Sequence, residues 1–81
     1  MNAREMFEKL GYRYTETFIS ILYINDSDDK YKTVEFYFSS LTIEITDNYD
    51  DSLKIDLELF DAIEQQIKEL RYVEWQQNKN I

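Results

Sequence analysis

The sequence predicts a small α+β domain, in which a three-stranded antiparallel meander carries an N-terminal and a C-terminal helix in the order α-β-β-β-α. Residues 56–70 have the apolar period of an amphipathic helix, and residues 33–38 and 41–46 alternate between apolar and polar side chains as strands do. The 81 residues suit one domain, residues 1–81. Because each helix has one apolar face, the simplest arrangement is a two-layer sandwich with both helices on the same face of the sheet.

The N-terminal helix has both of its ends marked. Asn2 can cap the first turn, and Glu5 stands at the capping-box position. Gly11, the only glycine of the chain, follows where a residue in the left-handed conformation ends a helix. Tyr12 can then fold back onto Phe7, a contact that often accompanies such an ending.

The segments between the helices predict three strands, at residues 14–24, 33–38 and 41–46, because they are rich in β-branched and aromatic side chains. The connections between them are short, which favours an antiparallel meander. The side chains expected to face the helices are Ile19, Ile21, Tyr23, Val34, Phe36, Phe38, Leu41, Ile43 and Ile45.

The C-terminal helix is the longest periodic segment. Asp56 can cap its first turn, and Ile55 and Phe60 occupy the two positions of a hydrophobic staple. The apolar stripe expected to lie on the sheet consists of Leu59, Phe60, Ile63, Ile67 and Leu70. Beyond this stripe we expect the regular helix to loosen between Leu70 and Trp75, and residues 76–81 to be frayed.

The composition narrows the classes of function. The chain has no Cys and no His, so it lacks thiol nucleophiles, thiolate metal sites and the usual general base. It has no secretory signal and no apolar run long enough to cross a membrane, which favours a cytoplasmic protein without membrane contact. We expect no cofactor.

The net charge of −8 is unevenly distributed. The whole excess of acids lies from Asn25 onward, because three cations balance three acids before it: Arg4, Lys9 and Arg13 against Glu5, Glu8 and Glu16. A surface of this sign repels nucleic acid, so we expect no direct nucleic-acid binding. The same charge also keeps a small protein soluble, which is the simpler interpretation.

Two acidic loops invite comparison with calcium sites, and both fail it. The first has Asp26, Asp28 and Asp29 followed by Lys30, without the glycine that an EF-hand loop requires. The second loop, with Asp47, Asp50 and Asp51, fails likewise. No nucleophile-base set or phosphate-binding glycine loop is present, so we expect neither a metal site nor an enzyme.

The first predicted strand is apolar on both sides, which is unusual for a sheet with one wet face. Monomers seldom expose a large apolar patch unless it binds something. The candidate protein interface, on the sheet face away from the helices, is Phe18, Leu22, Ile24 and Tyr37. Two alternatives stay open. In the first alternative, the strand has the opposite phase and Ile19, Ile21 and Tyr23 face outward. In the second, one helix covers each face of the sheet.

The residues that begin and end the two predicted helices resemble those of a known group of proteins. The segment Arg-Glu-Met-Phe-Glu-Lys-Leu-Gly-Tyr at 4–12, the short strands, and Ala-Ile-Glu-Gln-Gln-Ile-Lys-Glu-Leu at 62–70 are similar to small uncharacterised proteins of phages and prophages of Gram-positive bacteria. The resemblance covers most of the chain, but it rests on helix ends and core residues. It implies no activity, cofactor or catalytic residue.

These observations lead to two hypotheses of function. The first is a small phage- or prophage-derived accessory protein that acts by protein–protein binding, with itself as the expected partner, as a homodimer. The alternative is an acidic mimic of DNA that inhibits a nucleic-acid-binding protein by placing carboxylates where phosphates would lie.

Overall fold

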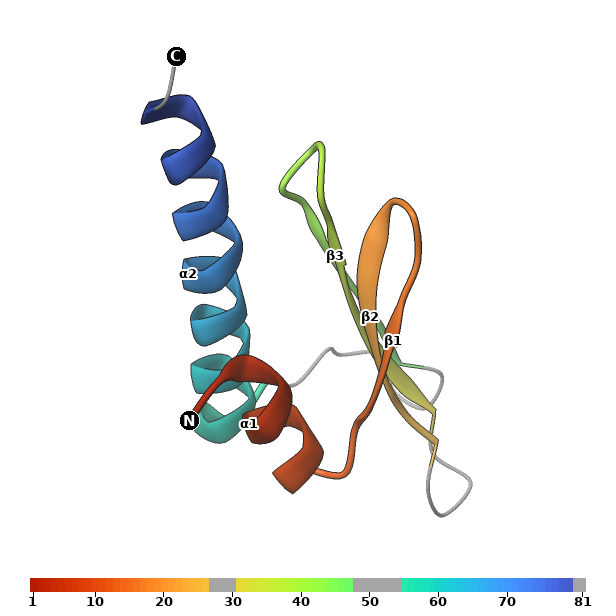
Figure 1. Cartoon of the computed structure of the whole chain (residues 1–81). Helices are drawn as coiled ribbons and strands as arrows, with labels where there is room; N and C mark the ends of the chain where they lie inside the picture. The colour runs from red at the N-terminus through yellow and green to blue at the C-terminus, as the bar shows by residue number, and fades with distance from the viewer. Residues whose placement is uncertain (27–30, 48–54, 80–81) are drawn as a thin grey trace.

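The computed structural model describes residues 1–26, 31–47 and 55–79, with residues 72–79 described by their backbone alone. Its elements follow the order α1 (Ala3–Lys9), β1 (Arg13–Glu16), β2 (Ser20–Asn25), β3 (Lys32–Tyr37), β4 (Ile43–Asp47) and α2 (Leu57–Lys79). The four strands form one antiparallel sheet in the order β1-β2-β3-β4. The α+β class, the meander and the two terminal helices are thus confirmed (Figure 1).

The predicted number of strands was wrong, because residues 14–24 form a hairpin and not one strand. Thr17 closes the turn between β1 and β2: its N–H donates to the Ser20 carbonyl at 2.8 Å, and its hydroxyl oxygen accepts the N–H of Ser20 at 2.9 Å. Only Phe18 and Ile19 lie between these two residues. The turn therefore makes β1 a fourth strand, with Glu16 opposite Ile21.

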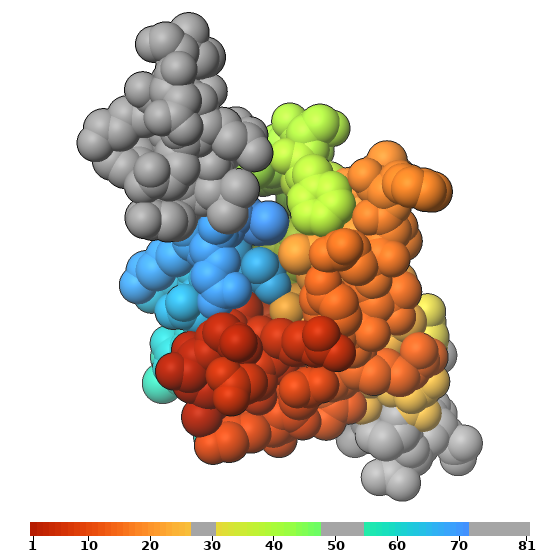
Figure 2. Space-filling view, in the orientation of Figure 1, coloured from red at the N-terminus to blue at the C-terminus, as the bar shows by residue number. Residues whose placement is uncertain are grey.

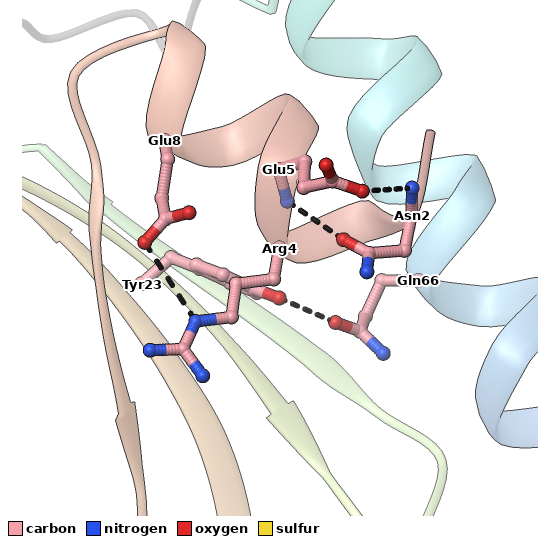
Figure 3. Close-up of polar contacts among 6 residues, drawn as sticks. All are labelled: Asn2, Arg4, Glu5, Glu8, Tyr23 and Gln66. Carbon is pink, nitrogen blue, oxygen red and sulfur yellow. Dashed lines mark hydrogen bonds and ion pairs between the residues drawn. The ribbon is translucent and has the colours of Figure 1, made fainter.

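The expected ends of α1 are confirmed. Asn2 accepts the N–H of Glu5 at 2.8 Å, and the Glu5 carboxylate accepts the N–H of Asn2 at 3.1 Å, which completes the capping box (Figure 3). Gly11 has a φ of 93° and its N–H donates to Glu8, while the N–H of Tyr12 donates to Phe7. These two bonds are those of a Schellman motif, and they bring the Tyr12 ring edge-on to Phe7 at 5.5 Å between centroids.

α1 is also held by its neighbours. The backbone N–H of Ala3 donates to the Glu69 carboxylate of α2 at 2.8 Å, so α2 supplies a negative group to the first turn of α1. On the exposed side, the Arg4 guanidinium forms an ion pair with Glu8 (Figure 3). It also lies 4.3 Å from the centre of the Tyr14 ring in β1. α1 therefore joins α2 to the β1 side of the sheet.

α2 begins as expected and runs further than expected. Asp56 accepts the N–H of Leu59 at 2.8 Å, so it caps the first turn. The helix is continuous to Lys79, so the expected loosening of the backbone between Leu70 and Trp75 was wrong. The side chain of Trp75 and residues 80–81 lie outside the described part, and fraying of residues 76–81 stays a prediction. No helix among the described residues is both long and apolar enough to cross a membrane.

The core lies between the sheet and both helices, which share one face of it. The Phe7 ring stacks on Tyr23 with 3.8 Å between centroids, and Phe36 meets both rings edge-on. The buried cluster consists of Phe7, Tyr12, Ile21, Tyr23, Val34, Phe36, Leu59, Ala62 and Ile63. The predicted phase of the strands is confirmed at Ile21, Tyr23, Val34 and Phe36, and Ile45, Ile67 and Leu70 pack against this cluster.

Part of the predicted inward set and of the helical stripe is not buried. Phe60 of α2 is 52% exposed. Four predicted inward residues are also exposed: Ile19, Phe38, Leu41 and Ile43. The reason is their position, since Ile19, Phe38 and Leu41 lie in the turns beyond the strands, and Ile43 is the first residue of β4.

Candidate functional site

The outer face of the sheet, away from the helices, holds three of the four residues predicted as an interface. Leu22 and Ile24 lie on it in β2, and Tyr37 lies on it in β3. Ile24 is buried, and Leu22 and Tyr37 are half-buried; β2 and β3 are both interior strands with a neighbour on each side. Phe18 is elsewhere, fully exposed in the turn between β1 and β2.

A polar network occupies the same outer face. The Glu35 carboxylate accepts hydrogen bonds from the hydroxyls of Ser20 at 2.7 Å and of Tyr37 at 2.9 Å. The hydrogen bond that the Tyr37 hydroxyl donates to Glu35 is the main cause that raises the pKa of Tyr37. The Ser20 side chain is fully buried. Tyr37 therefore presents a fixed polar group, which interrupts the apolar patch expected there.

A larger apolar surface stands at one end of the sheet. Five large apolar side chains of the two turns and their strand ends are each at least 36% exposed: Phe18, Ile19, Phe38, Leu41 and Ile43. We refer to these residues as the hairpin end. In Figures 1 and 2 the two turns, orange and lime green, stand side by side at the same end of the molecule.

Backbone hydrogen bonds join the two turns of the hairpin end. The N–H of Phe38 donates to the carbonyl of Ile19 at 3.0 Å, which ties the β3–β4 connection to the β1–β2 turn. Within the β3–β4 connection, the N–H of Tyr37 donates to Thr42 at 3.0 Å. The exposed apolar side chains are therefore held on a common support, which keeps the cost of ordering them on binding low.

Leu41 is held in an unfavourable backbone conformation. Its φ is 55°, and it is the only residue other than glycine with a positive φ in the described part of the chain. This conformation costs a residue with a Cβ about 1–2 kcal/mol, and Gly or Asn would adopt it more easily. The Leu41 side chain is 44% exposed, so burial accounts for only part of the preference for leucine at this position. Strain of this kind directs attention to a role outside the fold.

A small cavity lies beside the hairpin end, between α2 and the β3–β4 hairpin. It encloses about 120 Å³ and is lined by Phe36, Tyr37, Leu41, Thr42, Ile43, Ile67, Leu70 and Arg71. Most of this lining is apolar and no titratable pair converges on it, so it continues the apolar surface and does not resemble a reaction site.

The acidic residues give no metal site in the described segments, where no three acidic side chains come together as ligands. Asp26 forms an ion pair with Arg13 at 3.2 Å. Asp28, Asp29, Asp50 and Asp51 lie outside the described residues, so the two loops and the DNA-mimic hypothesis stay untested.

Sequence reasoning missed the hairpin end because it placed most of these residues inside strands. Ile19 and Leu41 were assigned to the buried side, although both stand beside hydroxyl residues that form turns. The signal available for the missed turn was the Thr17–Ser20 spacing, since serine and threonine hydroxyls stabilise turns by local hydrogen bonds; Ser39–Ser40 was already expected to be a connection between strands.

Comparison of this chain with protein-family models, with curated proteins and with solved structures finds no match. The resemblance to phage and prophage proteins therefore stays a prediction.

Proposed function

We propose that this protein acts by protein–protein binding and that its hairpin end is the contact surface through which it forms a homodimer. The observation that supports this proposal is the set of exposed apolar side chains on two turns joined by the Phe38–Ile19 hydrogen bond. The strained Leu41 adds to it, because the fold keeps a leucine where asparagine would cost less. An accessory protein of a phage or prophage, as the resemblance implies, fits such a role.

The distribution of charge favours a second copy as the partner. The chain has a net charge of −8, yet residues 17–25 and 36–43, which include the whole hairpin end, contain no charged side chain. Two copies can therefore meet at this end without bringing acidic side chains together. Burial of the apolar side chains then stabilises the contact, and a two-fold dimer is the commonest form of such an assembly.

The test measures mass against concentration by analytical ultracentrifugation. The monomer mass is 9.9 kDa, and we expect twice this value for the wild type at micromolar concentration. Phe18→Ser and Leu41→Asn should both shift the protein to monomer. Leu41→Asn is the sharper variant, because asparagine adopts a positive φ readily and its effect on folding should be small.

The matched control is Leu57→Ser, which removes a leucine that is 82% exposed at the start of α2, at the opposite end of the molecule (Figure 1). It should leave the dimer intact. Leu22→Ser tests whether the outer face of the sheet, and not the hairpin end, is the dimer interface. If Leu22→Ser breaks the dimer and the two hairpin-end variants do not, the interface is the outer face. A wild type that stays monomeric at every concentration overturns self-association.

A further inference from the structure

β4 is an edge of the sheet, and in the described part of the chain only β3 pairs with it. Ile43, Glu44 and Thr46 are exposed there. An edge of this kind presents unpaired backbone N–H and C=O groups, which proteins commonly protect with proline or charge. The chain has no proline, so the charges of Glu44 and Asp47 are the only protection of this kind on β4.

The free backbone groups of β4 belong to its isoleucines. The N–H of Tyr37 donates to the carbonyl of Thr42 where the hairpin begins. Bonded and unbonded positions alternate along an antiparallel pair, so Glu44 also bonds to β3. Ile43 and Ile45 therefore direct their N–H and C=O groups toward the open edge.

An apolar groove lies on the β4 side of α2. It encloses about 450 Å³ and is lined by Phe60, Ile63, Glu64, Ile67, Lys68 and Arg71. Ile67 and Arg71 also line the cavity that includes Ile43 of β4, which places the groove and the strand edge on the same side of the molecule. Phe60 lines this groove and is half-exposed there.

The charge on the other side of β4 is uncompensated. Glu44 stands directly opposite Glu35 of β3 on the outer face. Neither carboxylate forms an ion pair with a described residue, and Glu35 accepts its hydrogen bonds from neutral hydroxyls. Like charges directly opposite each other on a sheet are destabilising, so a cation beside Glu44 would relieve this row.

We propose that the free edge of β4 binds an extended segment of another protein in which a basic residue stands between two apolar residues. The segment adds a fifth strand to the sheet through the backbone groups of Ile43 and Ile45. Its basic side chain lies beside Glu44 on the outer face. Because strand side chains alternate, its apolar neighbours point to the inner side, into the groove over Phe60 and Ile67.

A second copy of this chain is a poor occupant of the same edge. Pairing of Ile43-Glu44-Ile45 with its own copy would extend the glutamate row to four carboxylates across the two sheets. The net charge of −8 also attracts a basic segment to this edge, where the glutamates are not kept apart from the partner. This binding is separate from the proposed dimer, which uses the hairpin end.

The test uses two short labelled peptides, one alternating isoleucine with lysine and one alternating isoleucine with glutamate, titrated by fluorescence anisotropy. The lysine peptide should bind the wild type with a Kd below about 100 µM, and about tenfold or more tighter than the glutamate peptide. Glu44→Lys should reverse this preference. Glu16→Lys makes the same charge change on β1, the other edge strand, and should preserve it.

Amide hydrogen exchange of the wild type gives a second measurement, because attraction between charges alone would not protect particular backbone N–H groups of β4. Exchange at Ile43 and Ile45 should slow when the lysine peptide binds, while Glu44 and Thr46, already bonded to β3, should change little. The proposal is overturned if the lysine peptide fails to bind at about 1 mM, which would be too weak for a specific site. It is also overturned if Glu16→Lys acts as strongly as Glu44→Lys, or if protection appears away from β4.

Discussion

The hydroxyl of Tyr23 in β2 donates a hydrogen bond of 2.6 Å to the side-chain oxygen of Gln66 in α2, and both side chains are buried (Figure 3). This bond fixes the rotation of α2 over the sheet, because Gln66 can reach Tyr23 only with its own face of the helix turned inward. The Tyr23 ring is at the same time stacked on Phe7 of α1. One side chain of the sheet therefore positions both helices.

Tyr23→Phe should lower the free energy of unfolding by about 1–3 kcal/mol, because it leaves the buried oxygen of Gln66 without its donor. The ring stacking on Phe7 is kept, so the change isolates the hydroxyl. Urea denaturation followed by circular dichroism measures the loss. Tyr14→Phe is the matched control, since the Tyr14 hydroxyl bonds only to exposed Glu16 and its removal should cost less than about 0.5 kcal/mol.

Alkaline pH should destabilise the fold partly through the same residue. Burial raises the pKa of Tyr23, and burial likewise raises the pKa of Tyr12. The unfolded chain therefore loses these phenolic protons first, above a pH of about 10, while the folded chain keeps them. The contribution of the protonated tyrosines to the free energy of unfolding is therefore fully present below this pH and falls as the pH rises above it. Tyr23→Phe should show a shallower fall than the wild type in urea denaturation, and an identical slope would contradict this assignment.

Gly11→Ala should lower the free energy of unfolding by about 1–2 kcal/mol through the backbone alone. Gly11 has a φ of 93°, whereas an added Cβ would meet its nearest neighbour, the side chain of Asn25, at an ordinary contact distance of 3.5 Å. Gly11→Asn should cost less, since asparagine tolerates the left-handed conformation. Equal losses for the two variants would indicate crowding as the cause.

The ends of the helices could be predicted from the sequence because their causes are local. Asn2, Glu5 and Gly11 act on backbone groups a few residues away, so their spacing is sufficient evidence. The turn at Thr17 could not be predicted in the same way. It contains an aromatic and a β-branched residue without Gly, Pro, Asn or Asp, and only the Thr17 hydroxyl distinguishes it from a strand.

The missed turn also explains why the predicted interface was not fully exposed. Leu22 and Ile24 were expected to be uncovered because residues 14–24 were taken as one strand with both helices on its other face. In the structure Arg13 of β1 and Thr33 of β3 stand on the two sides of Ile24. Register across strands is set by a turn's position, so one missed turn changes the exposure of a whole row.

Ile63→Ala and Ile67→Ala should lower the free energy of unfolding by different amounts, because the two halves of the apolar stripe of α2 are buried to different degrees. Ile63 belongs to the buried cluster, so its truncation should cost about 2–5 kcal/mol. Ile67 is half-buried and lines the cavity and the groove, so its truncation should cost about 1–2 kcal/mol. Urea denaturation measures both, and Phe60→Ala, at an exposed position of the same helix, should cost less than either.

The proposed dimer should resist salt. Its surface, the hairpin end, lies in segments without charged side chains, and apolar burial is not screened by ions. The screening length falls to about 4–5 Å near 0.5 M salt, so the residual repulsion between two acidic copies also weakens. Sedimentation at low salt and near 0.5 M should therefore give a dimer that is as tight or tighter at the higher concentration.

The acidic hypothesis predicts the opposite response for a basic partner, because carboxylates that stand in for phosphates lose their attraction as salt rises. Neutralising variants make the comparison direct. Asp47→Asn should leave the dimer unchanged, whereas Leu41→Asn should dissociate it at both salt concentrations. If a complex of this protein dissociates near 0.5 M salt and depends on Asp47, its contact surface is the acidic surface and not the hairpin end.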